Sequence, residues 1–262
     1  MRGIRCLVAA VLAAGIVTVV AAQPGGGGFG FGQGDTTMLV LTNAALQEEV
    51  KVTDAQKTKF KELAEKQTEM YKKANEGMKE KFADAKGDQD KFKELFAGMQ
   101  KENAKVAAEV KKLVEAELTA DQKKRLKQIS VQAMGIRVFS EPTEGKGGFG
   151  GTTEAQKAIM KDVAETLKLT DDQKSKIKGF VEEYNKDRAS VQKDIFGDAK
   201  GKDLFDADKR KELVTKTAKL SKETMDKIAG ALDDTQKTAW KGLVGEPFDT
   251  TKLAPAPMPK KD

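Results

Sequence analysis

A phrase of eight residues occurs four times in this chain, and its spacing constrains the fold more than any other feature. The copies read VKVTDAQK, AELTADQK, LKLTDDQK and GALDDTQK and begin at positions 50, 116, 167 and 230. A shift of 117 residues places 50–53 on 167–170, and the far ends of the two blocks align at a shift of 114. Self-similarity of this kind is typical of a duplicated structural unit. The sequence therefore predicts two tandem helical repeats, at 35–144 and 152–246.

Each copy has the residue pattern of a helix N-terminus. Thr170 can act as an N-cap, and Gln173 then falls at the third helical position, from which its side chain reaches back to the cap. Asp replaces Thr in the fourth copy, which is an allowed exchange at an N-cap. An apolar residue stands directly ahead of each cap, where it could form a hydrophobic staple with the fourth helical residue. That fourth residue is lysine in all four copies, so we expect the apolar residue to pack between helices instead. The candidate motif residues and helix caps are Val52, Thr53, Gln56, Leu118, Thr119, Gln122, Leu169, Thr170, Gln173, Leu232, Asp233 and Gln236.

Between the copies, apolar residues recur with helical periods. The clearest stripe alternates steps of four and three, as in a coiled coil, through Phe92, Phe96, Met99, Asn103, Val106, Val110 and Leu113. Its polar member, Asn103, either fixes the register of two helices or faces a gap. The less regular helix before it is expected to extend from Phe60 to Phe82. The segments 85–90 and 197–203 have the composition of turns and separate paired helices.

The predicted fold is all-α: two tandem long antiparallel helical hairpins with short flanking helices, in an elongated or cradle-like arrangement. Charged residues make up 34% of the chain, so the apolar stripes are narrow and the other faces are charged. Helices with such narrow stripes cannot enclose a thick core, and we expect thin layers.

Glycine and proline punctuate the chain outside the repeats. The segments 23–34 and 145–151 are rich in glycine and are interpreted as flexible linkers. The alternative is that Phe29, Phe31 and Phe149 are exposed aromatic side chains that bind a partner. The tail, 247–262, is rich in proline and lysine, and we expect it to be disordered.

The first 22 residues have the pattern of a secretory signal peptide. Arg2 and Arg5 precede an apolar run that ends in small residues. The run is short for a membrane span, and an uncleaved anchor is the alternative. After cleavage no apolar run is long enough to span, so we expect no stable membrane insertion, and a periplasmic or otherwise exported protein. Cys6 would leave with the signal, so packing alone must hold the fold together.

The composition disfavours catalysis and several kinds of ligand. The chain has no histidine, so a Ser–His triad and imidazole metal sites are excluded, and we expect no enzyme activity, no cofactor and no metal site. A carboxylate site for Ca²⁺ or Mg²⁺ is not excluded, although the acids do not have EF-hand spacing. The signal would carry two of the 47 basic residues, leaving 45 against 41 acids. Nearly all of the basic residues are lysines. Proteins that recognise nucleic acid favour arginine, so a nucleic-acid partner is not expected.

The repeated Leu-Thr-x-x-Gln phrase, its order around two long helices and the signal peptide resemble the LTxxQ-motif family, the Spy/CpxP-like periplasmic proteins. The resemblance covers each block from its first phrase to its second. It implies an all-helical cradle, built in the family by two chains, that binds unfolded or stressed envelope proteins without ATP. The duplication departs from the family, so one chain could build the cradle alone, with a homodimer as the alternative. The other functional alternative is a non-enzymatic stress-signalling accessory that binds a sensor protein, or a structural scaffold.

Overall fold

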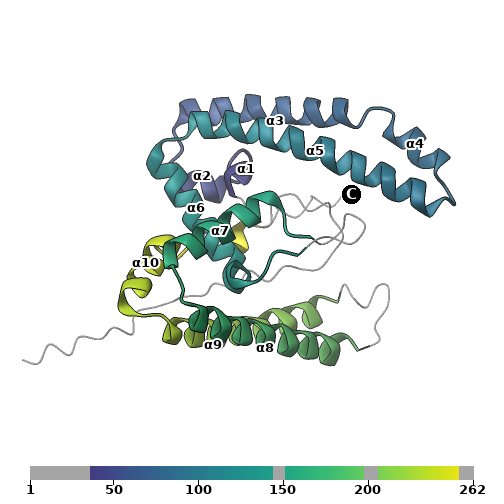
Figure 1. Ribbon diagram of the computed structural model, residues 1–262. Helices are drawn as coiled ribbons and strands as arrows, with labels where there is room; N and C mark the ends of the chain where they lie inside the picture. The colour runs from purple at the N-terminus through teal and green to yellow at the C-terminus, as the bar shows by residue number, and fades with distance from the viewer. Residues whose placement is uncertain (1–35, 144–150, 198–205, 254–262) are drawn as a thin grey trace, which may run out of the picture.

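The computed structural model describes residues 36–143, 151–197 and 206–253, and the regular structure in these ranges is entirely helical, which confirms the all-α class (Figure 1). The predicted signal peptide, the linker at 23–34 and residues 145–150 of the second linker lie outside the described residues. The helices are α1 Thr36–Leu39, α2 Ala44–Glu49, α3 Asp54–Ala74, α4 Met78–Asp84, α5 Gln89–Glu117, α6 Ala120–Met134, η1 (3₁₀) Gly135–Phe139, α7 Glu154–Leu167, α8 Asp171–Phe196, α9 Ala207–Ala231, α10 Asp234–Val244 and η3 (3₁₀) Thr250–Leu253.

In the first repeat, α3 packs antiparallel against α5. Gln56 in the first turn of α3 donates to the carbonyl oxygen of Glu117 at the end of α5, at 2.6 Å. At the other end of α3, the amide of Asn75 donates to Oδ1 of Asn103 in the middle of α5, at 2.8 Å. Asn103 therefore ties the register of the two helices and does not face a gap.

The helix expected to reach Phe82 breaks earlier. α3 ends at Ala74, and α4 begins after Gly77, whose φ of +71° lies in the left-handed region. Glycine adopts this conformation without the steric cost that a side chain imposes. The apolar periodicity continues across the break, which is why the sequence alone did not reveal it.

In the second repeat, α8 and α9 also run antiparallel. Gln173 in the first turn of α8 donates to the carbonyl oxygen of Ala231, the last residue of α9, at 2.9 Å. Further along, Lys227 of α9 forms an ion pair with Glu183 of α8 at 2.9 Å. Small polar side chains are buried along α9: Thr217, Ser221 and Thr224.

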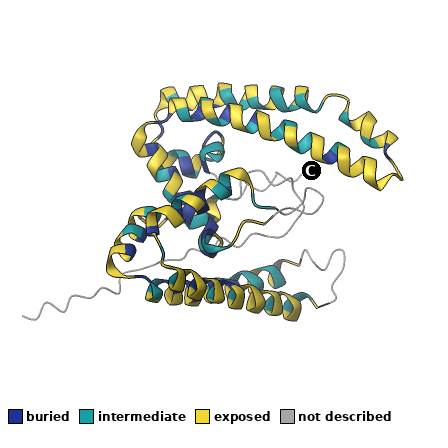
Figure 2. Ribbon diagram, viewed as in Figure 1, coloured by how far each residue is buried: buried dark blue, intermediate teal, exposed yellow. Residues whose placement is uncertain are grey.

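The buried side chains form two cores that meet at α6 (Figure 2). Leu126 and Ile129 of α6 belong to the core of the first repeat, and Val131 and Met134 belong to that of the second. The predicted boundary between the repeats, at 145–151, therefore does not coincide with the boundary between the cores. Figure 1 shows both helix pairs extending from a junction formed by α6, α7 and α10.

The first part of the tail crosses from the second repeat to the first. Phe248 is 5% exposed and packs in the core of the first repeat. Its backbone N–H donates to Gln132 at 2.8 Å, and the carbonyl oxygen of Lys252 accepts from Asn43 at 2.8 Å. The expectation of disorder is therefore wrong for 247–253, because an aromatic side chain and the backbone polar groups find partners on the other repeat. Residues 254–262 lie outside the described ones.

Candidate functional site

The four repeated phrases lie at the starts of α3, α6, α8 and α10, and the Thr or Asp of each phrase is the N-cap of its helix. The side chains of Thr53, Thr119, Thr170 and Asp233 accept from the backbone N–H of the glutamine three residues later, at 3.2, 3.3, 3.2 and 2.8 Å. Each glutamine oxygen accepts in return from the N–H of its cap at 2.9 to 3.0 Å. Thr153 and Gln156 form the same capping box at the start of α7. These reciprocal bonds satisfy backbone donors that a helix leaves unpaired at its start.

The glutamines of each repeat also bind one another. In the first repeat, the amide of Gln56 donates to Oε1 of Gln122 at 2.8 Å, and the amide of Gln122 donates back at 3.0 Å. In the second, Gln173 and Gln236 exchange the same two bonds at 2.7 and 2.9 Å. We call each arrangement a glutamine pair. It joins the starts of two helices whose glutamines are 66 or 63 residues apart.

Each paired glutamine reaches a third partner. Gln122 donates to the carbonyl oxygen of Lys51 at 3.4 Å, and Gln236 donates to that of Leu167 at 3.1 Å. A glutamine side chain is needed for this arrangement because it both accepts and donates, whereas a glutamate is an acceptor only when ionised. Sequence reasoning identified the caps but missed the pairs. The third helical position is glutamine in all four copies and never glutamate, and this was the signal that could have revealed the pairs.

The apolar residue ahead of each cap faces the helix junctions. Val52, Leu118 and Leu232 are buried, and Leu169 is half-buried against the core of the second repeat. The motif as a whole therefore builds the fold at the ends of the helix pairs near the junction.

A strained residue occupies the second position of the first phrase in each repeat. Lys51 and Lys168 have φ values of +54° and +46°, in the left-handed region that disfavours residues with a side chain. These residues turn the chain from α2 into α3 and from α7 into α8. The equivalence supports the duplication, since both repeats make the same turn with the same residue type.

The first-turn aspartates of α3 and α8 are exposed, and neighbouring lysines lower their pKa values. The ammonium groups of Lys57 and Lys174, each 2.9 Å away, hold the pKa values of Asp54 and Asp171 below their usual range by hydrogen bonding and charge attraction. Both carboxylates stand in solvent on helix starts, an arrangement that fits dipole compensation rather than acid–base catalysis.

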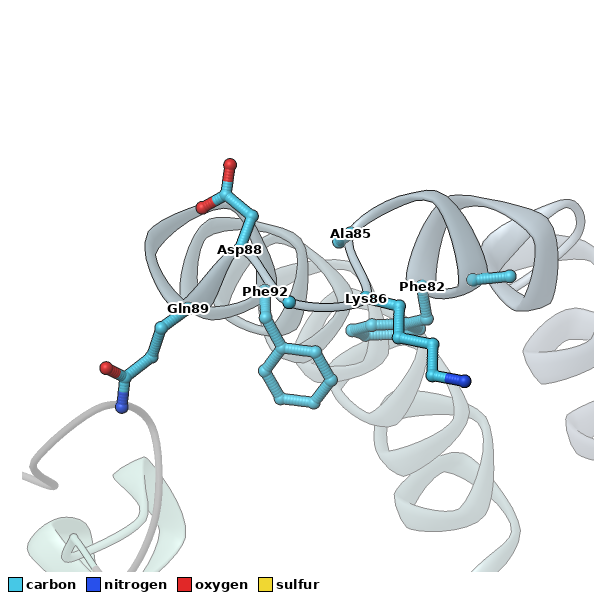
Figure 3. A pocket seen from close by; sticks show the side chains of 8 residues that line it. Phe82, Ala85, Lys86, Asp88, Gln89 and Phe92 are labelled. Atoms are coloured by element: carbon cyan, nitrogen blue, oxygen red, sulfur yellow. The ribbon is translucent and has the colours of Figure 1, made fainter.

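Among the described residues, the most exposed large apolar side chain lies at the end of the first helix pair far from the junction. Phe82 of α4 and Phe92 of α5 have ring centroids 5.0 Å apart, with planes tilted by 52°. Phe92 stacks in turn with Phe96 at 6.5 Å. The rings of Phe82 and Phe92 line a pocket of about 420 Å³, which we call the tip pocket. Its lining residues are Phe82, Ala83, Ala85, Lys86, Gly87, Asp88, Gln89 and Phe92 (Figure 3).

The predicted stripe of α5 is therefore wrong at Phe92. Its side chain is 43% exposed, whereas Phe96, Val106 and Val110 are buried. At the other end of the stripe Val114 is fully buried while Leu113 is half-buried. The break before α4 removes a straight partner helix from the start of α5, and this leaves Phe92 at the surface.

The far end of the second helix pair also carries apolar side chains that belong to neither core. In the described part of this pair, Val191, Ile195 and Phe196 of α8 and Leu213 and Val214 of α9 are half-buried. Both pairs are two helices thick at these ends, so their apolar side chains have one packed side and one side toward solvent.

Within the described ranges, no three His, Cys, Asp or Glu side chains come together in a way that could hold a metal ion. Across 36–143, 151–197 and 206–253, no helix combines the length and the apolar character that a membrane crossing requires.

No family model, no curated protein and no solved structure matches this chain.

Proposed function

We propose that this chain is an exported, ATP-independent chaperone-like protein of the periplasm that binds unfolded or stressed envelope proteins. The proposal includes the cleaved signal peptide at 1–22 and membership of the LTxxQ-motif family, both of which are based on sequence pattern. In this proposal the glutamine pairs hold the helix pairs together, and the far ends of the pairs contact clients.

One observation carries the proposal: apolar side chains outside both cores gather at the far ends of the helix pairs, on a surface that is otherwise densely charged. Phe92, which is 43% exposed, is the most exposed of the large side chains in this set. Burial of apolar surface contributes about 25 cal/mol per Å², so a few such side chains give weak and reversible binding. The mixed charges around them would keep a complex with an unfolded client in solution.

Suppression of client aggregation tests the proposal. Two unrelated proteins are unfolded and diluted with and without an equimolar amount of the purified chain in the absence of ATP, and light scattering is followed. We expect reduced scattering for both clients. The control is an unrelated helical protein of similar size and net charge, which should leave the scattering unchanged. Capture of one specific envelope protein without any effect on aggregation would instead support the stress-signalling accessory or scaffold.

A further inference from the structure

We infer that the tip pocket binds one large apolar side chain, aromatic or branched aliphatic, of an extended polypeptide segment. The inference rests on the proposed function for the class of ligand and adds the place where that ligand is held. It is carried by the construction of the pocket, its size and the polar groups around it.

The pocket is formed by elements that are already fixed. Asp88 caps α5 by accepting from the N–H of Lys91 at 3.0 Å, and its own N–H donates to the carbonyl oxygen of Ala85 at 3.0 Å. Ala85 is buried beneath this turn. Phe96, buried and stacked on Phe92, supports the exposed ring from below. A binding surface that is ordered before the ligand arrives avoids much of the entropic cost of binding.

The size of the pocket limits the ligand. Its volume of about 420 Å³ is near the lower end of the range for small-ligand sites, roughly 300–1,000 Å³. The tilted rings of Phe82 and Phe92 leave faces and edges available to a third ring, and aromatic pairs favour such tilted or offset contacts. One large side chain fits this space, whereas a folded domain contacts little of it.

The polar groups beside the rings favour a polypeptide over a lipid chain. Figure 3 shows the Phe92 ring between the side chains of Gln89 and Lys86, with Asp88 directed to the opposite side of the turn. The amide of Gln89 can donate to and accept from a peptide backbone. Adsorption to anionic lipid takes clusters of about four to eight basic residues, whereas the pocket has one lysine, and nearby Lys93 is paired with Asp90 at 3.2 Å.

A second copy of this chain fits less well. Stable dimers bury at least about 1,200 Å² in total, and the pocket is formed by eight residues at the end of a two-helix layer. A single side chain, in contrast, needs no more surface than the pocket offers.

Peptide binding tests the inference. The probes are fluorescent 11-residue Gly/Ser peptides with a central Phe, Leu or Ala, and binding to the purified chain is measured by fluorescence anisotropy. We expect the Phe and Leu peptides to bind about tenfold more tightly than the Ala peptide, as burial of one large apolar side chain would give. Phe92→Ser should abolish this preference. The matched control, Phe180→Ser, removes a half-buried ring that packs against the core of the second repeat in the junction-side half of α8, and it should retain the preference.

Two further measurements make the result decisive. Circular dichroism melts establish that Phe92→Ser and Phe180→Ser are folded, and Phe82→Ser provides a second variant on the other wall of the pocket. A peptide whose central Phe carries a photoreactive group on its ring should crosslink to residues within 82–92. An unchanged preference in both pocket variants, or labelling elsewhere, would overturn the inference.

The same variants distinguish a peptide from other occupants of the pocket. They also distinguish failure of the pocket from failure of the proposed function. Loss of binding to anionic vesicles in Phe92→Ser, without a change in peptide affinity, would replace the peptide with a lipid surface. Loss of a sedimenting dimer in that variant would replace it with a second copy. If the chain suppresses client aggregation but its peptide affinity does not depend on Phe92, the pocket fails and the proposed function stands. If the Phe peptide binds at the pocket but no client is protected, the proposed function fails and the pocket stands.

Discussion

The two repeats are joined in the same way near the junction and differ at their far ends. Both have two capped helices held by a glutamine pair, with bond lengths that agree to within about 0.1 Å. At the far end, the first repeat breaks at Gly77 and exposes Phe92, whereas α8 continues unbroken to Phe196. The shared half of each repeat builds the fold, and the divergent half is free to acquire a binding role.

The interior of each helix pair shows the same contrast. The first pair uses an Asn75–Asn103 hydrogen bond, and the second buries Thr217, Ser221 and Thr224 instead. Asparagine in a helix seam specifies register at a cost in stability, whereas small side chains permit close approach of the helices. The repeats therefore reach similar architectures through different contacts beyond the glutamine pairs.

The largest expected effect concerns the cores. Phe60→Ala should cost about 3–5 kcal/mol and its counterpart Ile177→Ala about 2–5 kcal/mol, because each leaves a cavity. Since α6 and Phe248 connect the cores, we expect each variant to lower one shared unfolding transition in calorimetry. Two separate transitions, with one repeat unaffected, would show that the repeats fold independently.

The glutamine pairs are expected to contribute equally in the two repeats. Gln122→Leu and Gln236→Leu should each cost about 1–3 kcal/mol, because partner groups near the buried site lose their hydrogen bonds. Urea titration measures both, and exposed Gln192→Leu on α8 is the control, with an expected change within about 0.5 kcal/mol. A clear inequality between Gln122 and Gln236 would break the equivalence of the two joints.

Glycine at the strained lysines should stabilise the protein. Lys51→Gly and Lys168→Gly are each expected to gain about 0.5–1 kcal/mol, since relief of the left-handed strain exceeds the entropic cost of glycine. Lys176→Gly inside α8 is the opposite control and should lose about 1 kcal/mol. Thermal melts that show destabilisation at 51 or 168 would mean that the lysine side chains make contacts that offset the strain.

The smallest expected effect is a pH dependence shared by Asp54 and Asp171. Their pKa values are depressed below 3.8 in the folded state, so the stability they contribute is present above that value and is lost as pH falls through the folded pKa. Asp54→Asn and Asp171→Asn should therefore lower Tm slightly at pH 7, and this difference should shrink as pH falls below 3.8 and the carboxylates become protonated. A difference that persists in acid would assign the effect to the side-chain shape rather than to charge.

The local structure could be predicted from the sequence because it depends on residues three or four positions apart. The Thr or Asp cap, the glutamine that follows it and the helical periods all lie within a few residues of one another, and the structure has capping boxes at Thr53, Thr119, Thr170 and Asp233. The all-α class followed from the same local patterns.

Tertiary structure alone decided the features that depend on distant residues. The glutamine pair joins positions more than 60 residues apart, and the burial of Phe248 depends on a core built by the other repeat. Phe92 satisfies the apolar period of α5 but is exposed because the break at Gly77 diverts its partner helix. A periodic pattern states which residues share a helix face, and only the packing of the other elements determines whether that face is covered.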